Sequence, residues 1–327
     1  MRAFDYASPG VLDDVLALLP ADGDESIRPL AGGTDLLTLM KADIVAPAQL
    51  VNIKGLPELS RIRDEGPDGL TLGALTTLAE LETSPIITER YPVLAEAVSL
   101  AATPQLRNMA TVGGNLLQRS RCWYFRNPRV HCWLKGGDAC QAQDGENRLH
   151  AILGGGSCWS AHPSDIAPAL LALDAEVRLR GPAVERTLPL AEFFALPADD
   201  RRTETVLGPG ELVLSIRIPP APTQTRSTYL KAMDRKIWAF ALVGVAAALR
   251  LDGRRVVHAR LALGGVAPIP WRATAAEAVL LDGEASAELF TRAAEAALAD
   301  AESLRDNGYK LPLTRTLIRQ AFTTLAA

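Results

Sequence analysis

Hydrophobic residues recur at helical spacing in several separate stretches of the chain. The first stretch, residues 11–19, places Val11, Val15 and Leu19 on one face and follows Ser8-Pro9, a pair typical of a helix start. Similar spacing or a capping residue predicts further helices at residues 36–40, 77–84, 92–101, 165–174, 273–281, 286–299 and 313–325. Short helices are therefore expected from near the start of the chain to near its end.

Short stretches rich in valine, leucine and isoleucine predict strands between these helices. They lie at residues 27–30, 50–53, 70–73, 175–179 and 213–218. Two longer apolar runs, residues 240–251 and 256–264, flank Asp252-Gly253, a turn typical of an antiparallel hairpin. Helices follow this hairpin, and the order indicates an α+β domain at the C-terminal end.

A proline- and threonine-rich stretch, residues 219–225, follows the last of the short predicted strands. Proline cannot continue a central strand and favours extended linkers, so this stretch is a candidate domain boundary. We expect an N-terminal domain at residues 1–222, with lobes at about 1–56 and 57–222, and a C-terminal α+β domain at residues 223–327.

Composition narrows the classes of protein. The 327 residues suffice for two or three domains, and 48% hydrophobic with 22% charged residues is typical of a globular protein. The net charge of −4 argues against a nucleic-acid partner.

The start of the chain has no apolar leader, and the longest apolar run, residues 238–249, is too short to span a bilayer. We expect no membrane span and a cytoplasmic protein, or a periplasmic one if a signal-bearing partner exports it.

Two glycine pairs are candidate ligand-binding turns. Residues 31–35 read AGGTD and lie between a predicted strand and a predicted helix, and residues 111–115 read TVGGN. Glycines let backbone amides approach an anionic group, and a helix start adds a favourable dipole. The alternative is a plain connection between elements. No G-x-G-x-x-G and no Walker-type lysine loop occurs, which disfavours the usual nucleotide folds. A basic cluster, Arg119, Arg121, Arg126 and Arg129, is a further candidate for an anionic partner.

All four cysteines lie in one glycine- and tryptophan-rich segment: Cys122, Cys132, Cys140 and Cys158. They form no C-x-x-C pair, which is poor evidence for structural zinc. Two disulfides would add little to a chain of this size in a reducing compartment. Four thiolates on a long loop can also hold a [4Fe–4S] cluster. Iron–sulfur, zinc, and free or disulfide-bonded cysteines all remain open at this point.

Other side chains near the cysteines have two interpretations each. Trp123, Trp133 and Trp159 each adjoin a cysteine, and they would either shield a metal centre from water or simply pin an irregular loop. His131 and His162 are candidate alternative ligands, although a lone histidine more often only forms hydrogen bonds.

Together these motifs resemble the FAD-binding medium subunits of the xanthine dehydrogenase, or molybdenum hydroxylase, family. The resemblance rests on AGGTDLL at residues 31–37, QLRN at 105–108, ATVGGNL at 110–116, HPSD at 162–165, LGGVA at 263–267 and PWR at 270–272. It implies a two-lobed FAD-binding domain of the vanillyl-alcohol oxidase type, followed by a C-terminal α+β domain.

The cysteine segment indicates a branch of this family. Most such subunits lack it, whereas the flavin subunits of bacterial aldehyde oxidoreductases and of 4-hydroxybenzoyl-CoA reductase carry a [4Fe–4S] cluster on an inserted loop, here about residues 119–160. The runs RCWYF at 121–125 and CWSAHPSD at 158–165 are most similar to the aldehyde oxidoreductase branch. Gly154-Gly155-Gly156 departs from that pattern, which would have a stiffer Gly-Thr or Gly-Ser turn.

The resemblance also implies roles for individual residues. The amides of one stretch would cradle the FAD diphosphate: Leu30, Ala31, Gly32, Gly33, Thr34, Asp35, Leu36 and Leu37. Thr111, Gly114 and Asn115 would form a second flavin-contacting turn. Asp165 would bind the adenosine ribose or a nearby FAD group, Lys231 would lie near the flavin, and Val213 would pack beside the cofactor. Cys122, Cys132, Cys140 and Cys158 would ligate the cluster.

The implied function is electron transfer within a heterotrimer and not substrate oxidation by this chain. A molybdenum-cofactor large subunit would oxidise an aldehyde, a [2Fe–2S] small subunit would relay electrons, and FAD here would pass them to an external acceptor. Flavin subunits of a xanthine dehydrogenase or an aromatic-CoA reductase are alternatives within the family. A zinc-binding scaffold without flavin and a free-standing flavin oxidase are alternatives outside it.

Overall fold

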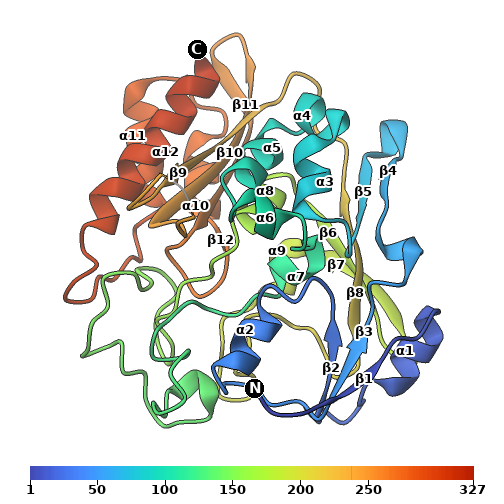
Figure 1. Cartoon of the computed structure of the whole chain (residues 1–327). Coiled ribbons are helices and arrows are strands. Elements are labelled where there is room, and N and C mark those ends of the chain that lie inside the picture. Colours follow the sequence, from blue (N-terminus) through green and yellow to red (C-terminus); the bar gives the residue numbers. More distant parts are fainter. Residues whose placement is uncertain (237) are drawn as a thin grey trace.

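The computed structural model describes residues 1–236 and 238–327, and these residues form three β-sheets with helices packed around them (Figure 1). The first sheet is parallel and has the order β1-β3-β2, where β1 is Asp5–Ala7, β2 is Ile27–Leu30 and β3 is Gln49–Asn52. Two short helices, α1 (Leu12–Leu18) and α2 (Leu36–Lys41), belong to this first lobe.

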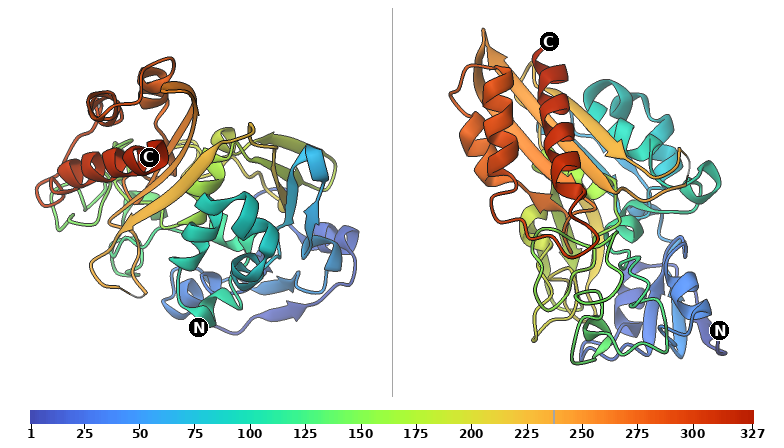
Figure 2. Two further views of the ribbon diagram at one scale, coloured as in Figure 1. Left: turned by 90° about the horizontal axis from the view of Figure 1, so that it is seen from above. Right: turned by 90° about the vertical axis from the view of Figure 1, so that its left-hand side faces the viewer.

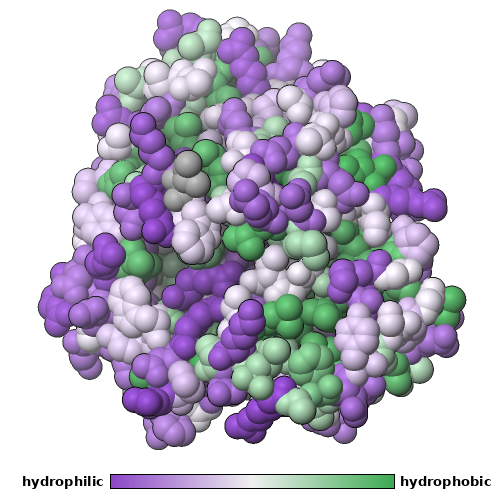
Figure 3. All heavy atoms as spheres, in the orientation of Figure 1, coloured by the Kyte–Doolittle hydropathy of each residue, from purple (hydrophilic) through white to green (hydrophobic). Residues whose placement is uncertain are grey.

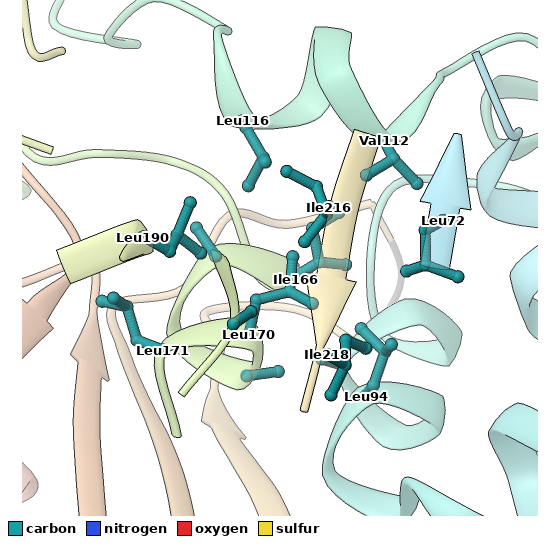
Figure 4. Packing of buried hydrophobic residues seen from close by; sticks show 14 of the residues in the cluster. Leu72, Leu94, Val112, Leu116, Ile166, Leu170, Leu171, Leu190, Ile216 and Ile218 are labelled. Carbon is teal, nitrogen blue, oxygen red and sulfur yellow. The ribbon is translucent and has the colours of Figure 1, made fainter. Parts of the chain in front are cut away.

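The second sheet is antiparallel and five-stranded, in the order β4-β5-β8-β6-β7. Its strands are β4 (Ile62–Asp64), β5 (Leu70–Gly73), β6 (Glu176–Arg180), β7 (Glu185–Pro189) and β8 (Leu212–Ile218). Its helices are α3 (Leu78–Thr83), α4 (Pro85–Arg90), α5 (Pro92–Ser99), α6 (Pro104–Arg107), α7 (Val112–Leu116), α8 (Ile166–Ala172) and α9 (Leu190–Phe193). Ile216 and Ile218 of β8 pack on Ile166, Leu170 and Leu94, which joins the sheet to the helices in one apolar core (Figure 4).

The third sheet is antiparallel and four-stranded, in the order β12-β11-β10-β9. Its elements are β9 (Arg226–Ala232), β10 (Val243–Asp252), β11 (Arg255–Gly264), β12 (Trp271–Arg272), α10 (Thr274–Leu280), α11 (Ala287–Ala296) and α12 (Lys310–Ala326). Side chains alternate across a strand, so Val245 and Ala247 join a core with α10–α12, while Ala246 joins the core of α5 and α8. The sheet therefore lies between two helical layers (Figure 2).

The cysteine segment contains a single short helix, η3 (Trp133–Lys135), in its otherwise irregular path. It follows α7 and returns to α8, lying beside α2 and against the C-terminal domain (Figure 1). Two further 3₁₀ turns are η1 (Pro57–Leu59) and η2 (Gly66–Asp68).

Over the face seen in Figure 1, hydrophilic and hydrophobic residues are intermixed (Figure 3). Within residues 1–236 and 238–327, no helix has both the length and the apolar character needed to cross a membrane.

Most predicted elements are confirmed to within a few residues, and two details are wrong. The first helix begins at Leu12 with Val11 as its N-cap, and Ser8 instead accepts a hydrogen bond from Asn52 at 3.0 Å. The hairpin strand predicted from residue 240 begins only at Val243, because residues 240–242 form the approach to the sheet.

Candidate functional site

A cavity of about 340 Å³ lies where the first glycine turn meets the second lobe. Six consecutive residues of the turn between β2 and α2 line it: Ala31, Gly32, Gly33, Thr34, Asp35 and Leu36. From the second lobe, Thr111 and Gly114 at the start of α7 and Val213 of β8 also line it. The two glycine motifs, about 80 residues apart in the sequence, thus face one space.

Glycine is required in the first turn for two different reasons. A Cβ at Gly32 would lie 1.7 Å from the carbonyl oxygen of Met109, so any side chain would push the two turns apart. Gly33 has a φ of 72°, in the left-handed region that favours glycine. The first turn therefore lies directly against Met109, which comes just before the second turn.

Five successive amides of the first turn are available to a ligand. Within residues 1–236 and 238–327, no intramolecular hydrogen bond engages the amide of any residue from 32 to 36, although all five residues line the cavity. A buried or half-buried amide normally has a partner. A row of free amides before a helix is what an anionic group such as a diphosphate can bind.

The amides of the second turn are engaged in hydrogen bonds within the protein. Thr111 Oγ1 accepts a hydrogen bond from the Gly114 amide at 3.2 Å, and the Gly113 amide donates to Ala74 O at 2.8 Å. Its role in the cavity is therefore that of a rigid wall, and the first turn supplies the free donors.

Charged side chains of both signs border the cavity. Arg28 and Arg119 line it, as does Glu204, which is only 5% exposed. Burial raises the pKa of Glu204, and the nearby Arg119 opposes that rise. Glu204 Oε1 has no hydrogen-bond partner in the described part of the chain. A buried orphan acceptor at a cavity indicates a ligand with a hydroxyl or amino group to donate.

Five of the predicted cofactor residues lie outside the cavity lining. Leu30 packs in a small apolar cluster with Leu37 against it, and Asn115 accepts a hydrogen bond from Ser164 at 2.5 Å. Asp165 and Lys231 form an ion pair with Nζ and Oδ2 2.8 Å apart, and their side chains are 5% and 0% exposed.

The buried pair has further partners of its own. Tyr229 donates to Asp165 Oδ1 at 2.8 Å, and Lys231 donates to Leu100 O at 2.8 Å. Burial raises the pKa of Asp165, while Lys231 and Tyr229 oppose that rise. Asp165 lies at the start of α8 and Lys231 lies in β9. The ion pair therefore joins a helix of the second lobe to the C-terminal sheet.

Sequence reasoning missed several lining residues. Thr203, Glu204 and Thr205 come from the loop between α9 and β8, and Glu211 and Leu212 from the start of β8. The only available signal was the polar run DDRRTET at residues 199–205. The proposed basic cluster was informative, because Arg119 lines the cavity.

Asp35 ties the first glycine turn to the beginning of the cysteine segment. Its carboxylate accepts hydrogen bonds from Arg126 at 2.7 Å, from the Arg119 amide at 2.8 Å, and from Arg121. Burial by itself would raise the pKa of Asp35, but Arg121 and Arg126 outweigh it and hold the pKa below its ordinary value. The carboxylate is therefore charged at neutral pH.

The four cysteines converge on a second, small cavity. Cys122, Cys132, Cys140 and Cys158 all line it, and all four are free thiols. Burial raises the pKa of Cys122 to about 11 and that of Cys158 to about 12. A reactive cysteine needs the opposite shift, so the arrangement does not favour nucleophilic or disulfide-exchange chemistry.

The surrounding aromatic residues bury the thiols. Trp133 packs in an apolar cluster with Phe125, Cys132 and Cys158, and is 5% exposed. A Cβ at Gly155 would lie 2.4 Å from the indole of Trp159, and Gly154 has a φ of 59°. The glycine run is thus needed to let the chain pass Trp159 on its way into Cys158.

Neither candidate histidine reaches the cysteine cavity. His131 is exposed, and His162 is buried beside the larger cavity. In the part of the chain that the structure describes, no three His, Cys, Asp or Glu residues are grouped so as to hold a metal ion.

A third cavity, of about 180 Å³, shares a lining residue with each of the other two. It shares His162 with the first cavity and Cys122 with the cysteine cavity, and its other walls include Arg121, Phe240 and His150.

Two family models match the chain. Residues 2–221 match the FAD binding domain in molybdopterin dehydrogenase, and residues 228–325 match the CO dehydrogenase flavoprotein C-terminal domain. The chain therefore belongs to the family of FAD-binding subunits of molybdopterin dehydrogenases, the molybdenum hydroxylases. The resemblance found in the sequence motifs is confirmed.

Individual relatives match over nearly their whole length. The Escherichia coli (strain K12) aldehyde oxidoreductase FAD-binding subunit PaoB is 38% identical over 318 residues, covering 96% of each chain. The carbon monoxide dehydrogenase medium chain of Hydrogenophaga pseudoflava is 32% identical, covering 97% of this chain and 95% of its own.

Solved structures show the same fold. Carbon monoxide dehydrogenase from Hydrogenophaga pseudoflava, in a form that lacks the Mo-pyranopterin moiety of its cofactor, matches with a TM-score of 0.78 and 31% identity, covering 98% of this chain and 96% of that one. Reconstituted CO dehydrogenase from Oligotropha carboxidovorans matches with a TM-score of 0.79 and 27% identity, covering 99% and 98%. The relatives are subunits of oxidoreductases.

Proposed function

We propose that the 340 Å³ cavity binds FAD and that the amides of residues 32–36 hold its diphosphate. The observation that carries the proposal is this row of unengaged amides, in a chain whose residues 2–221 match a FAD-binding family. Arg28 and Arg119 offset the negative charge of a diphosphate. Glu204 Oε1 accepts a hydrogen bond from a hydroxyl or amino group of the same ligand.

The protein's contribution is to bind and orient the cofactor. Bound FAD exchanges electrons either singly or in pairs. Gly32 keeps the two turns in contact, Val213 gives the cavity an apolar wall, and Asp35 fixes the turn through three hydrogen-bond donors. We assign the domain to the vanillyl-alcohol oxidase type, because a small parallel sheet and a larger antiparallel sheet flank one cavity.

We also propose that the four cysteines hold a [4Fe–4S] cluster. They line one cavity, their burial disfavours free thiolates, and metal binding is the usual way to stabilise several buried thiolates together. Cys122, Cys132, Cys140 and Cys158 would be the ligands of the cluster.

We infer that the chain is the electron-transfer subunit of a heterotrimer with a molybdenum-cofactor large subunit and a [2Fe–2S] small subunit. An aldehyde is the proposed substrate of the complex, because the aldehyde oxidoreductase subunit is more similar to this chain than the carbon monoxide dehydrogenase chains are. The external electron acceptor would be reduced at the flavin. No described residue needs to serve as a general acid or base for this role.

Anaerobic reduction of the assembled complex tests this role. The chain is expressed alone and together with a molybdenum-cofactor large subunit and a [2Fe–2S] small subunit. Addition of an aldehyde is expected to bleach the flavin absorption only in the complex. Turnover of aldehyde and oxygen by the isolated chain would instead favour a free-standing oxidase. A complex that oxidises carbon monoxide or a purine but no aldehyde would overturn the substrate assignment and leave the subunit role intact.

A further inference from the structure

His150 is the one imidazole that contacts a cysteine sulfur in the described part of the chain. It lies between Cys140 and Cys158 in the sequence and is 1% exposed. Its Nε2 is 3.1 Å from Cys122 Sγ. Trp123 packs edge-on against the ring, with centroids 5.0 Å apart, so the ring has a fixed orientation toward the sulfur.

The C-terminal domain holds the backbone of this histidine in place. Lys310, at the start of α12, is fully buried, and its Nζ donates to His150 O and Leu149 O at 2.9 Å and to Gly265 O at 2.7 Å. Asn307 donates to Ala151 O at 2.8 Å. These bonds fix the backbone of residues 149–151, so the contact of His150 with Cys122 depends on the C-terminal domain.

The chemistry of the two atoms determines the direction of the hydrogen bond. A thiolate bound to metal has no proton and can only accept. A neutral imidazole carries one N–H, and Nδ1 of His150 is buried without a partner among the described residues. The proton therefore belongs on Nε2, which donates to Cys122 Sγ.

We propose that His150 is a positioning residue that raises the reduction potential of the cluster by donating this hydrogen bond to Cys122. The inference rests on the [4Fe–4S] cluster of the proposed function. One-electron reduction adds a negative charge that is shared with the ligand sulfurs, so an N–H donor stabilises the reduced form more than the oxidised form. Cys122 also lines the 180 Å³ cavity, which shares His162 with the flavin cavity.

The test compares two substitutions at one position in the full chain. His150→Phe keeps an aromatic ring against Trp123 but removes the donor, whereas His150→Gln keeps an N–H near the position of Nε2. His131→Phe is the matched control, because His131 lies in the same loop beside Cys132 but is exposed. Each protein is titrated anaerobically with dithionite, and the reduced cluster is followed by electron paramagnetic resonance.

We expect the reduced-to-oxidised ratio at a fixed potential to fall roughly tenfold in His150→Phe, which equals about 59 mV for a one-electron couple. His150→Gln and His131→Phe should stay near the wild-type value. An unchanged potential in His150→Phe, with the cluster present, overturns the role of His150 but leaves the cluster proposal standing. A wild-type protein without iron and sulfide overturns both.

Loss of iron from a variant is also informative. If His150→Phe and a second non-donor, His150→Leu, lose iron while His150→Gln keeps it, the donor is required and the proposal is supported. If all three variants lose iron equally, the side chain acts only by packing, and the proposal is overturned.

Discussion

Arg126 donates a hydrogen bond from Nη2 to Asp35 Oδ1 at 2.7 Å, across 91 residues of sequence. Asp35 belongs to the glycine turn at the flavin cavity, and Arg126 lies between the first two cysteines. The candidate flavin turn and the cysteine loop are thus held together by a partly buried ion pair. A change at this contact is expected to affect both sites.

Asp35→Asn removes the charge that Arg121 and Arg126 share. We expect the free energy of unfolding to fall by about 1–3 kcal/mol, because charge-assisted hydrogen bonds in a mostly buried place are lost. Both FAD and iron content should decrease. Asp13→Asn is the control: Asp13 pairs with Arg180 at the surface, where such a pair contributes about 0–1 kcal/mol. Equal effects of the two substitutions would contradict the linking role.

The same pair predicts a pH dependence. Because the folded-state pKa of Asp35 is lowered, its stabilisation is complete above the ordinary unfolded value of about 3.9 and is lost as the pH falls through the lowered folded value. The difference in unfolding free energy between wild type and Asp35→Asn should be constant from neutral pH down to about pH 4 and shrink below it. Chemical denaturation at a series of pH values measures this. A difference that grows toward acid would have the wrong sign.

Gly32→Ala tests the contact between the two glycine turns. The new Cβ would meet Met109 O at 1.7 Å, so the turns must separate. We expect FAD affinity to fall at least about tenfold, together with about 1–3 kcal/mol of destabilisation. Affinity is measured by flavin fluorescence during rebinding to deflavinated protein. Gly10→Ala, where a Cβ meets nothing within 4 Å, should bind FAD normally. Wild-type affinity in Gly32→Ala would refute the proposed cradle.

Asp165→Asn leaves Lys231 as a buried charge without its counterion. Removing one partner of such a pair costs about 3–5 kcal/mol, and the double variant with Lys231→Met should recover a large part of that loss. Thermal unfolding with FAD analysis separates two roles. If the pair only supports the fold, stability and FAD binding recover together in the double variant. If Asp165 itself binds FAD, stability recovers and FAD binding does not.

Lys310→Met tests how the C-terminal domain holds the cysteine loop. Three backbone carbonyls lose their donor inside the core, for which we expect a loss of about 2–5 kcal/mol. Hydrogen exchange of the amides in residues 144–152 should accelerate more than in the rest of the chain. Lys41→Met, at an exposed lysine, is the control. Uniform exchange across the chain would argue against a local clamp.

Local patterns predicted most of the fold, and the strands they missed have a common position. β1, β4, β7, β9 and β12 each lie at an edge of their sheet. An edge strand pairs on one side only and carries mixed polar residues, so its apolar pattern is weak. The central strands β3, β5, β6, β8, β10 and β11 were predicted, because burial on one or both faces gives them a clear apolar pattern.

The candidate sites were predictable only where a short sequence motif marks them. Both glycine turns and the cysteine group could be identified from short motifs. Glu204 could not, because its place at the cavity depends on how its loop folds back to pair with the residues at the end of α9. The ion pair of Asp165 with Lys231 spans 66 residues, and the contact of His150 with Cys122 depends on a clamp from the C-terminal domain. Long-range packing of this kind leaves no local pattern.

Cofactor analysis of the natively purified chain tests the central claim most directly. Protein, acid-released flavin, iron, zinc and acid-labile sulfide are measured in one sample. The account predicts about one FAD with about four iron and about four sulfide per chain. About one zinc per chain, with no flavin and no sulfide, would contradict it and identify a zinc-binding scaffold.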